Sequence, residues 1–352
     1  MNDKKKLGVL VVDDSAFNRR NIAEIFAGSD DAEVIGKASD GDEALRLVAQ
    51  LRPDVITLDL EMPRMDGFTF LRILMAKQPT PVIVVSSYSQ KENVFKALEL
   101  GAIDFVAKPE RQVAPEGADV RTELLEKVRL VRNLRRAARE VRSVRPKDVP
   151  PPPSEQPSGA PRLVIGVASS TGGPTALLEV FSKLSARLPA AVLVAQHMPD
   201  KFTRTFAERL DKRGTFRVSE GQEGDVVQAQ RGYVCPGRQC MEVVRVGAEL
   251  RLRTGAPGSN DRYVPSADRL LRSIAAVASP SVGICGVVLT GMGDDGLLGA
   301  RAIREAGGVV VVESEETAVV YGMPGAVARA GLANEVLPLG KIADYLATLG
   351  SP

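Results

Sequence analysis

Short apolar segments alternate with helix-like segments along both halves of this 352-residue chain, and this alternation restricts the fold more than any other feature. The apolar runs have the length of buried strands, and the segments between them have apolar residues at helical spacing. Strands that alternate with helices form a parallel sheet with helices on both faces. In the first half we expect strands at 7–12, 33–36, 54–58, 81–85 and 103–106, and helices at 16–26, 42–50, 68–76 and 91–100.

The second half repeats this pattern with one interruption. Short strand-like stretches between 216 and 253 predict a β-rich insertion on the sheet. The chain as a whole is therefore expected to be α/β, with two doubly wound parallel sheets. In this half the expected strands are 162–168, 191–196, 282–289 and 308–312, and the expected helices are 175–186, 202–211, 264–276, 297–306, 323–330 and 341–349.

A basic segment and a proline-rich segment separate the two halves. Residues 120–144 have an apolar stripe at helical spacing and many arginines on the opposite face, and prolines follow at 150–153. We interpret this region as the last helix of the first domain running into a semi-stiff linker. A basic arm that binds a partner or a phosphate is the alternative. The expected domains are 1–125 and 161–350, joined by a helix and linker at 126–160.

Composition excludes several classes of protein. The net charge of +2 argues neither for nor against nucleic-acid binding. Aromatic residues make up 4% and tryptophan is absent, so a base-stacking surface is not expected, nor is a nucleic-acid partner. No apolar run approaches the roughly 20 residues of a membrane span, so no membrane insertion is expected. The three cysteines lack zinc-site spacing, which fits free thiols in a reducing cytoplasm.

Polar residues of the first half follow the ends of the predicted strands. They are Asp13, Asp14, Asp59, Ser86 and Lys108. The carboxyl ends of parallel strands meet at one edge of a sheet, where ligands bind. Three carboxylates at that edge would repel one another unless a cation joined them, and oxygen ligands favour Mg²⁺. A carboxylate beside a lysine and a hydroxyl is suited to phosphoryl transfer.

The second half places a serine, a histidine and a carboxylate after three different strands. Ser170 lies in a strand–turn–helix segment, His197 is the only histidine of the chain, and Asp294 and Asp295 lie in a glycine-rich loop around Met292. A nucleophilic serine needs a base and a carboxylate that orients that base. Spacing leaves the choice between the two adjacent aspartates open. Ser170 as a helix cap and His197 as a structural residue are the alternatives.

Residues 7 to about 125 resemble the receiver domains of response regulators, which have a flavodoxin-like fold. The matching features are the acidic pair, the segment Leu58-Asp59-Leu60-Glu61-Met62-Pro63, Asp66-Gly67, Ser86 and Lys108-Pro109. The resemblance implies that Asp59 accepts a phosphoryl group, and that Asp13, Asp14 and Asp59 bind Mg²⁺. It also implies that Ser86 and Lys108 contact the phosphoryl group, and that Phe105 takes the position of the switch aromatic.

Residues 162 to about 348 resemble the catalytic domain of chemotaxis protein-glutamate methylesterases, the CheB family, which is Rossmann-like. The motifs are Ser170-Thr171-Gly172-Gly173-Pro174, Gln196-His197-Met198-Pro199, Leu289-Thr290-Gly291-Met292-Gly293 with Asp295-Gly296, and Tyr321-Gly322-Met323-Pro324. The resemblance implies a triad of Ser170, His197 and Asp295, with the Met292 N–H in the oxyanion hole and no cofactor in this domain. Ala168-Ser169 departs from the usual Gly-Ala of the family.

Together the two resemblances imply a serine esterase controlled by phosphorylation. It would remove methyl groups from γ-glutamyl esters of chemoreceptors, and some members of the family also deamidate receptor glutamines. The implied partners are a histidine kinase as phosphodonor and methyl-accepting chemoreceptors as substrates. The alternative is a response regulator whose second domain binds a protein or a nucleotide without catalysis.

Overall fold

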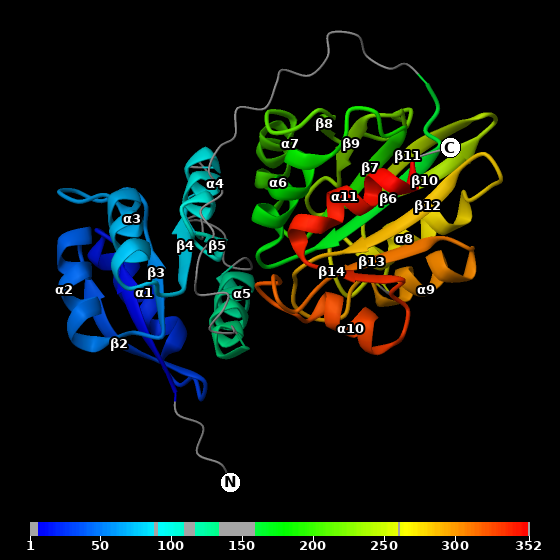
Figure 1. The fold of residues 1–352 in the computed structure, drawn as a ribbon. Coiled ribbons are helices and arrows are strands. Elements are labelled where there is room, and N and C mark those ends of the chain that lie inside the picture. Colours follow the sequence, from blue (N-terminus) through cyan, green and yellow to red (C-terminus); the bar gives the residue numbers. More distant parts are fainter. Residues whose placement is uncertain (1–5, 88–90, 109–116, 134–158, 260, 351–352) are drawn as a thin grey trace. The chain divides into compact units, whose positions relative to one another are not determined.

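The computed structural model describes residues 6–87, 91–108, 117–133, 159–259 and 261–350. The chain divides into two compact units, Met1–Arg145 and Pro146–Pro352, which are described separately below (Figure 1). The division falls inside 126–160, the region expected to join the domains. Helix α5 (Gly117–Leu130) runs across the expected limit at residue 125 and ends in a 3₁₀ turn at Val131–Asn133. The rest of the helix expected at 120–144 lies outside the described residues.

The first unit contains a five-stranded parallel sheet with the order β2-β1-β3-β4-β5. This is the flavodoxin-like order, so the expected fold is confirmed. The strands are β1 (Leu7–Val12), β2 (Ala32–Ala38), β3 (Val55–Leu58), β4 (Val82–Ser86) and β5 (Asp104–Ala107). The helices between them are α1 (Ala16–Phe26), α2 (Gly41–Leu51), α3 (Gly67–Lys77) and α4 (Lys91–Glu99).

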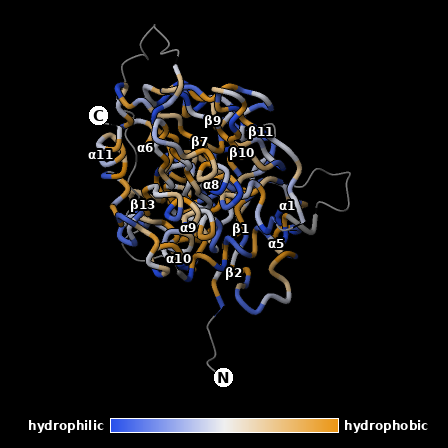
Figure 2. Tube along the Cα trace, turned by 90° about the vertical axis from the view of Figure 1, so that its right-hand side faces the viewer, coloured by the Kyte–Doolittle hydropathy of each residue, from blue (hydrophilic) through white to orange (hydrophobic). Residues whose placement is uncertain are grey.

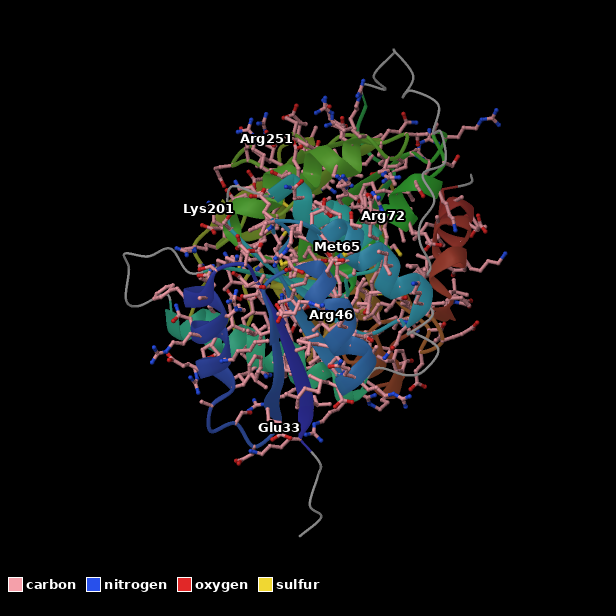
Figure 3. All side chains as sticks on the ribbon, turned by 90° about the vertical axis from the view of Figure 1, so that its left-hand side faces the viewer. Glu33, Arg46, Met65, Arg72, Lys201 and Arg251 are labelled. Carbon is pink, nitrogen blue, oxygen red and sulfur yellow. The ribbon has the colours of Figure 1, made fainter. Side chains whose placement is uncertain are left out.

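Local chemistry explains where these helices begin. Ser15, Asp40 and Asp66 each accept the backbone N–H of the residue three positions later, at the starts of α1, α2 and α3. Such caps satisfy N–H groups that have no partner within the helix. Every residue of β1 is buried, as a strand covered on both faces requires. The outer faces of the helices are charged, as Arg46 on α2 and Arg72 on α3 illustrate (Figure 3).

The second unit contains a seven-stranded sheet with the order β14-β13-β12-β6-β7-β9-β8, parallel throughout. Strand β6 lies at the centre, with β7 on one side of it and β12, which comes later in the chain, on the other. Ligands of open α/β sheets bind at the carboxyl ends of the strands where the order reverses in this way. The bounds are β6 (Leu163–Ser169), β7 (Ala190–Gln196), β8 (Arg217–Glu220), β9 (Arg231–Val234), β12 (Gly283–Val288), β13 (Val309–Glu313) and β14 (Glu335–Leu337).

Two groups of helices cover this sheet. Helices α6 (Gly173–Lys183), α7 (Thr203–Asp211) and α11 (Leu339–Leu349) pack together on one face, and α8 (Ala267–Ala276), α9 (Leu297–Glu305) and α10 (Met323–Arg329) on the other (Figure 1). All residues of β6 and β7 are buried between them. The helices change colour along their length in Figure 2, as expected for helices with one apolar and one polar side.

The expected β-rich insertion is smaller than the sequence pattern indicated. Only β10 (Cys240–Val246) and β11 (Glu249–Gly255) form a separate, antiparallel pair. Strands β8 and β9 instead extend the main sheet beyond β7, where they pair with a strand edge that would otherwise be open. The short apolar stretch at Val226 makes a single bridge to Arg251. Periodicity identifies short strands but not the edge that they join.

The structure adds one strand that the sequence pattern did not predict. Strand β14 pairs with the outer edge of β13, and the apolar pattern did not indicate it because it has only three residues. Among the residues that the structure describes, none of the helices combines the length and the apolar character needed to span a bilayer.

Candidate active site and receiver site

The turn between β6 and α6 presents Ser170 at the carboxyl end of a central strand. Strand β6 ends at Ser169, and α6 begins at Gly173 after Gly172, whose φ is 78°. Any other residue at position 172 would have a strained backbone at this φ, and its Cβ would lie only 2.8 Å from Val319. The turn therefore requires glycine, and it leaves Ser170 partly exposed at the start of a helix.

His197 follows the neighbouring strand at the equivalent position. Ser169 of β6 pairs in register with Gln196 of β7, and the His197 N–H donates to the Ser169 carbonyl at 3.0 Å. Ser170 and His197 are thus the residues that directly follow a paired position on adjacent strands. Within the described residues, no hydrogen bond joins the Ser170 hydroxyl to the His197 ring. Such contacts are often long in free enzymes and shorten when substrate binds.

Asp295, and not Asp294, contacts the histidine. The distance between His197 Nε2 and Asp295 Oδ2 is 2.8 Å, and Asp295 is 2% exposed. Its carboxylate also accepts the N–H groups of Ala267 at 2.8 Å and Asp268 at 2.9 Å, at the start of α8. Asp294 is half exposed and lies beside Arg262, at 3.4 Å. Of the two adjacent aspartates, Asp295 is buried and contacts the histidine, whereas Asp294 is half exposed and contacts Arg262 and Tyr263.

A reciprocal contact holds the Asp295 loop in place. Asp295 accepts N–H groups at the start of α8, while Asp268 in the first turn of α8 accepts the N–H groups of Gly296 at 3.0 Å and Gly299 at 2.7 Å, at the start of α9. Each carboxylate thus satisfies free N–H groups of the other helix. Burial raises the pKa of Asp268, and the hydrogen bonds from Gly299 and Gly296 oppose that rise.

The Ser169 and Gln196 side chains connect the two loops, a contact that sequence reasoning missed. Ser169 is fully buried, and its hydroxyl donates to Gln196 Oε1 at 2.7 Å. Gln196 Nε2 then donates to the carbonyls of Ser170 at 2.9 Å and His197 at 2.8 Å. A side chain at Gly173 would meet Gln196 Oε1 at 2.0 Å. Ser169 is therefore committed to this buried network, and Ser170 is the serine that faces solvent.

The loop that carries Met292 passes directly beside Ser170. A side chain at Gly291 would meet Ser170 Cβ at 2.8 Å, so the close approach requires glycine. The Ser170 N–H donates to the Thr290 carbonyl at 3.0 Å and is not free to bind a substrate. Within the described residues, the Met292 N–H makes no hydrogen bond to a backbone acceptor. It remains available to a ligand beside the serine.

Tyr263 is a further residue of the site that the sequence did not indicate. Its ring stacks on His197 with 5.2 Å between centroids and 9° between planes. Its hydroxyl donates to Asp294 Oδ1 at 3.3 Å. Tyr263 lies in the loop before α8, far from the serine and histidine motifs, and no local pattern marks it. A cavity of about 670 Å³ adjoins this ring, lined among others by Asp294, Asp295 and Leu298.

The acidic residues of the first unit meet at the carboxyl edge of its sheet. Asp13, Asp14 and Asp59 each offer a carboxylate oxygen within 4.8 Å of the others. Asp13 and Asp59 are buried, and Asp14 is exposed. Burial, together with the charge of Asp13, raises the pKa of Asp59, while Lys108 opposes the rise. Oxygen ligands of this kind suit a hard divalent cation.

Lys108 and Ser86 complete the receiver site. Lys108 Nζ lies 2.5 Å from Asp59 Oδ2 and 2.9 Å from Asp13 Oδ2. Burial lowers the pKa of Lys108, but the bonds to Asp13 and Asp59 outweigh this and raise it overall. Ser86 is buried at the end of β4, and its carbonyl accepts the Lys108 N–H at 2.7 Å. The ammonium of Lys108 contacts two of the three carboxylates, so the cluster keeps an excess of negative charge, which fits the binding of a cation.

Phe105 is buried in β5 behind this edge. Its ring packs edge-on against Phe95 with 6.1 Å between centroids. Its carbonyl accepts a hydrogen bond of 2.5 Å from Lys127 of α5, and the ammonium lies 5.4 Å from the ring centroid. Burial lowers the pKa of Lys127, but attraction from Asp104 and Glu123 outweighs this effect and raises the pKa overall. The aromatic residue expected at the switch position is therefore held by α5.

Two protein families match the two units. The family described as CheB methylesterase matches residues 165–346, and the family described as response regulator receiver domain matches residues 9–114. The second unit is similar to the crystal structure of the Thermotoga maritima CheB methylesterase catalytic domain. The TM-score is 0.51 with 34% identity, and the match covers 53% of this chain and 97% of that one.

Relatives of the same two-domain length are also found. The chain is 48% identical to protein-glutamate methylesterase/protein-glutamine glutaminase 1 of Myxococcus xanthus over 349 residues, 99% of each chain. It is 46% identical to protein-glutamate methylesterase/protein-glutamine glutaminase 3 of Geobacter sulfurreducens over 357 aligned positions, 96% of each. The chain therefore belongs to the CheB family, the protein-glutamate methylesterases that carry a receiver domain.

Proposed function

We propose that Ser170, His197 and Asp295 are the catalytic triad with which this CheB-family hydrolase cleaves γ-glutamyl methyl esters. The observation that carries the proposal is the 2.8 Å contact between His197 Nε2 and buried Asp295, next to the turn that exposes Ser170. Since His197 is the only histidine of the chain, no other imidazole can serve as the base. The carboxylate orients the ring and stabilises its positive charge during the reaction.

The proposed reaction has two stages. Ser170 Oγ attacks the ester carbonyl while His197 accepts the hydroxyl proton, and the protonated ring then passes that proton to departing methanol. With Nε2 held by Asp295, Nδ1 is the ring nitrogen left to face the serine. Water next attacks the acyl-enzyme, and His197 again acts as base and then acid. The Met292 N–H is proposed to bind the oxyanion in both stages.

A serine-directed phosphonate tests the assignment of the nucleophile. The native chain is expected to gain one phosphonyl group on the peptide that contains Ser170, measured by mass spectrometry. Ser169→Ala is the matched control and should still be labelled, because Ser169 is buried. Ser170→Ala should not be labelled. Labelling at Ser169, or labelling that persists in Ser170→Ala, would contradict the proposal.

The printed names of the relatives support the substrate class. Both the Myxococcus and the Geobacter proteins are named for methylesterase and glutaminase activity. We therefore propose methylated chemoreceptors as the substrates, and receptor glutamines as a second substrate. Deamidation passes through the same acyl-enzyme, with ammonia leaving in place of methanol. We place the enzyme in the cytoplasm, where a histidine kinase would supply its phosphoryl group.

At the receiver site we propose that Asp59 accepts the phosphoryl group and that Asp13, Asp14 and Asp59 hold Mg²⁺. A bound Mg²⁺ would offset negative charge on the transferring group. Ser86 and Lys108 are proposed to contact the phosphoryl oxygens, since both lie at the sheet edge where Asp59 follows its strand.

Calorimetric titration of Mg²⁺ tests this metal site and should show weaker binding in Asp13→Asn, with the exposed Asp42→Asn as control. Equal affinity in all three chains would contradict this metal site.

A further inference from the structure

A carboxyl group that the proposed reaction does not use lies close to the nucleophile turn, the turn between β6 and α6 that carries Ser170. Glu313, the last residue of β13, is 0% exposed. Its Oε2 accepts the Thr290 N–H at 2.8 Å, and its Oε1 accepts the Thr317 hydroxyl at 2.9 Å. Thr317 Oγ1 in turn accepts the Leu339 N–H, so its own proton is free to point at Glu313. An ionised carboxylate accepts both bonds, whereas a neutral acid must donate one.

Thr290 connects Glu313 to the turn that carries Ser170 through hydrogen bonds. Its carbonyl accepts the Ser170 N–H at 3.0 Å, and its hydroxyl donates to the Thr171 carbonyl at 2.8 Å. The same hydroxyl accepts the Val320 N–H at 2.9 Å. Thr290 also directly precedes Gly291 and Met292, the loop beside the serine. One backbone N–H, held by Glu313, thus fixes the residue that joins the nucleophile turn to the loop of the proposed oxyanion donor.

The surroundings of Glu313 oppose its negative charge. Burial raises the pKa of Glu313 from 4.5 to about 7, although the bonds from Thr290 and Thr317 lower it in part. Glu179 of α6 adds to the rise by repulsion, and its own partner is Lys183 at 2.9 Å. The loop after β12 contributes Thr290 and the segment after β13 contributes Thr317, both neutral. These surroundings bring the pKa of Glu313 up toward neutral pH.

We propose that Glu313 is a positioning residue for the reaction at Ser170. In its charged form it holds Thr290, and through Thr290 it keeps the nucleophile turn and the Met292 loop in their reactive arrangement. Protonation weakens that hold, because a charge-assisted hydrogen bond is about twice as strong as a neutral one. The inference rests on the proposed function of Ser170 and adds a second ionisation to the one that His197 must undergo as base.

The test compares pH profiles of the full chain and Glu313→Gln. The amide keeps the size of the side chain, its oxygen still accepts the Thr290 N–H, its nitrogen donates to Thr317 Oγ1 in place of accepting from it, and it cannot ionise. Methanol release from methylated receptor is measured without phosphodonor from about pH 6 to about pH 8.5, and kcat is separated from KM. Protonation of the base His197 lowers kcat toward about pH 6 in every chain. In the native chain, protonation of Glu313 should lower kcat there by roughly a further tenfold, with KM unchanged. This extra fall should be absent in Glu313→Gln.

Glu179→Gln provides a second, independent variant. Removal of this charge should move the midpoint of the extra fall to lower pH and leave its size unchanged, because Glu179 lies outside the hydrogen-bonded network of Thr290. A Glu313→Gln profile identical to that of the native chain, or an unmoved midpoint in Glu179→Gln, would overturn the inference but leave the triad standing. Native activity in Ser170→Ala would instead refute the proposed function itself.

Discussion

The Gln196 amide illustrates how single side chains set the geometry of this site. Its nitrogen donates to the carbonyls of Ser170 and His197, and its oxygen accepts the Ser169 hydroxyl. The Ser169 and Gln196 side chains are buried, so a lost bond between them costs stability that water does not restore. The serine and the imidazole must be positioned relative to each other to within a fraction of an ångström. The loss of this cross-link should therefore affect the chemical step more than substrate binding.

Gln196→Leu tests this role. The leucine removes the side-chain donor to the His197 carbonyl and one of the two donors to the Ser170 carbonyl, which also accepts the Gly173 N–H at 2.8 Å. The two loops lose their cross-link, so kcat should fall by roughly 10- to 100-fold, with KM changed by less than about threefold. Steady-state methanol release measures both parameters. Gln222→Leu, at an exposed position, is the control and should leave kcat unchanged. A rise in KM alone would show that Gln196 serves binding and not positioning.

The two adjacent aspartates give a second prediction for single residues. Asp295→Asn removes the carboxylate that orients His197, and kcat should fall by roughly 10⁴-fold, the size expected when the ring takes the wrong tautomer. Asp294→Asn should keep kcat within about threefold, because its carboxylate is half exposed and contacts Arg262 and Tyr263. Both variants are compared by kcat for methanol release. Equal losses in the two variants would contradict the assignment of Asp295.

At the scale of secondary-structure elements, the carboxyl ends of β6, β7 and β12 carry the site. Polar residues after apolar runs predicted that Ser170, His197 and Asp295 would gather there, because parallel strands share an edge. Contacts from elsewhere could not be predicted. Tyr263 reaches His197 from the loop before α8, and apolar periodicity gives no information on loop geometry. The α/β fold was predicted correctly, but the placement of β8 and β9 depends on sheet edges, which local sequence does not specify.

The buried end of β13 also predicts how stability depends on pH. The pKa of Glu313 is raised from 4.5 to about 7, so the folded chain binds a proton that the unfolded chain loses in this range. The contribution of Glu313 is therefore fully present below pH 4.5 and is lost as the pH rises to about 7, by about 3 kcal/mol. Urea unfolding should show that Glu313→Gln gains stability relative to the native chain over this interval. A constant difference would contradict the raised pKa.

At the scale of the whole molecule, the receiver and the esterase are separate units in one chain, and the proposed phosphorylation of Asp59 is the means by which one would control the other. Asp59→Ala should keep the basal rate of methanol release and lose its stimulation by a small phosphodonor. Asp42→Ala, an exposed change on α2, is the control and should respond as the native chain does. Full stimulation of Asp59→Ala would refute control through this residue.

Methanol release from methylated chemoreceptor, by the native chain and by Ser170→Ala, tests the central claim most directly. The measurement is made with and without a small phosphodonor, after circular dichroism has shown that both chains are folded. The native chain should release methanol, and faster with the phosphodonor, whereas Ser170→Ala should stay at the background rate in both conditions. Release by folded Ser170→Ala at the native rate would contradict the account.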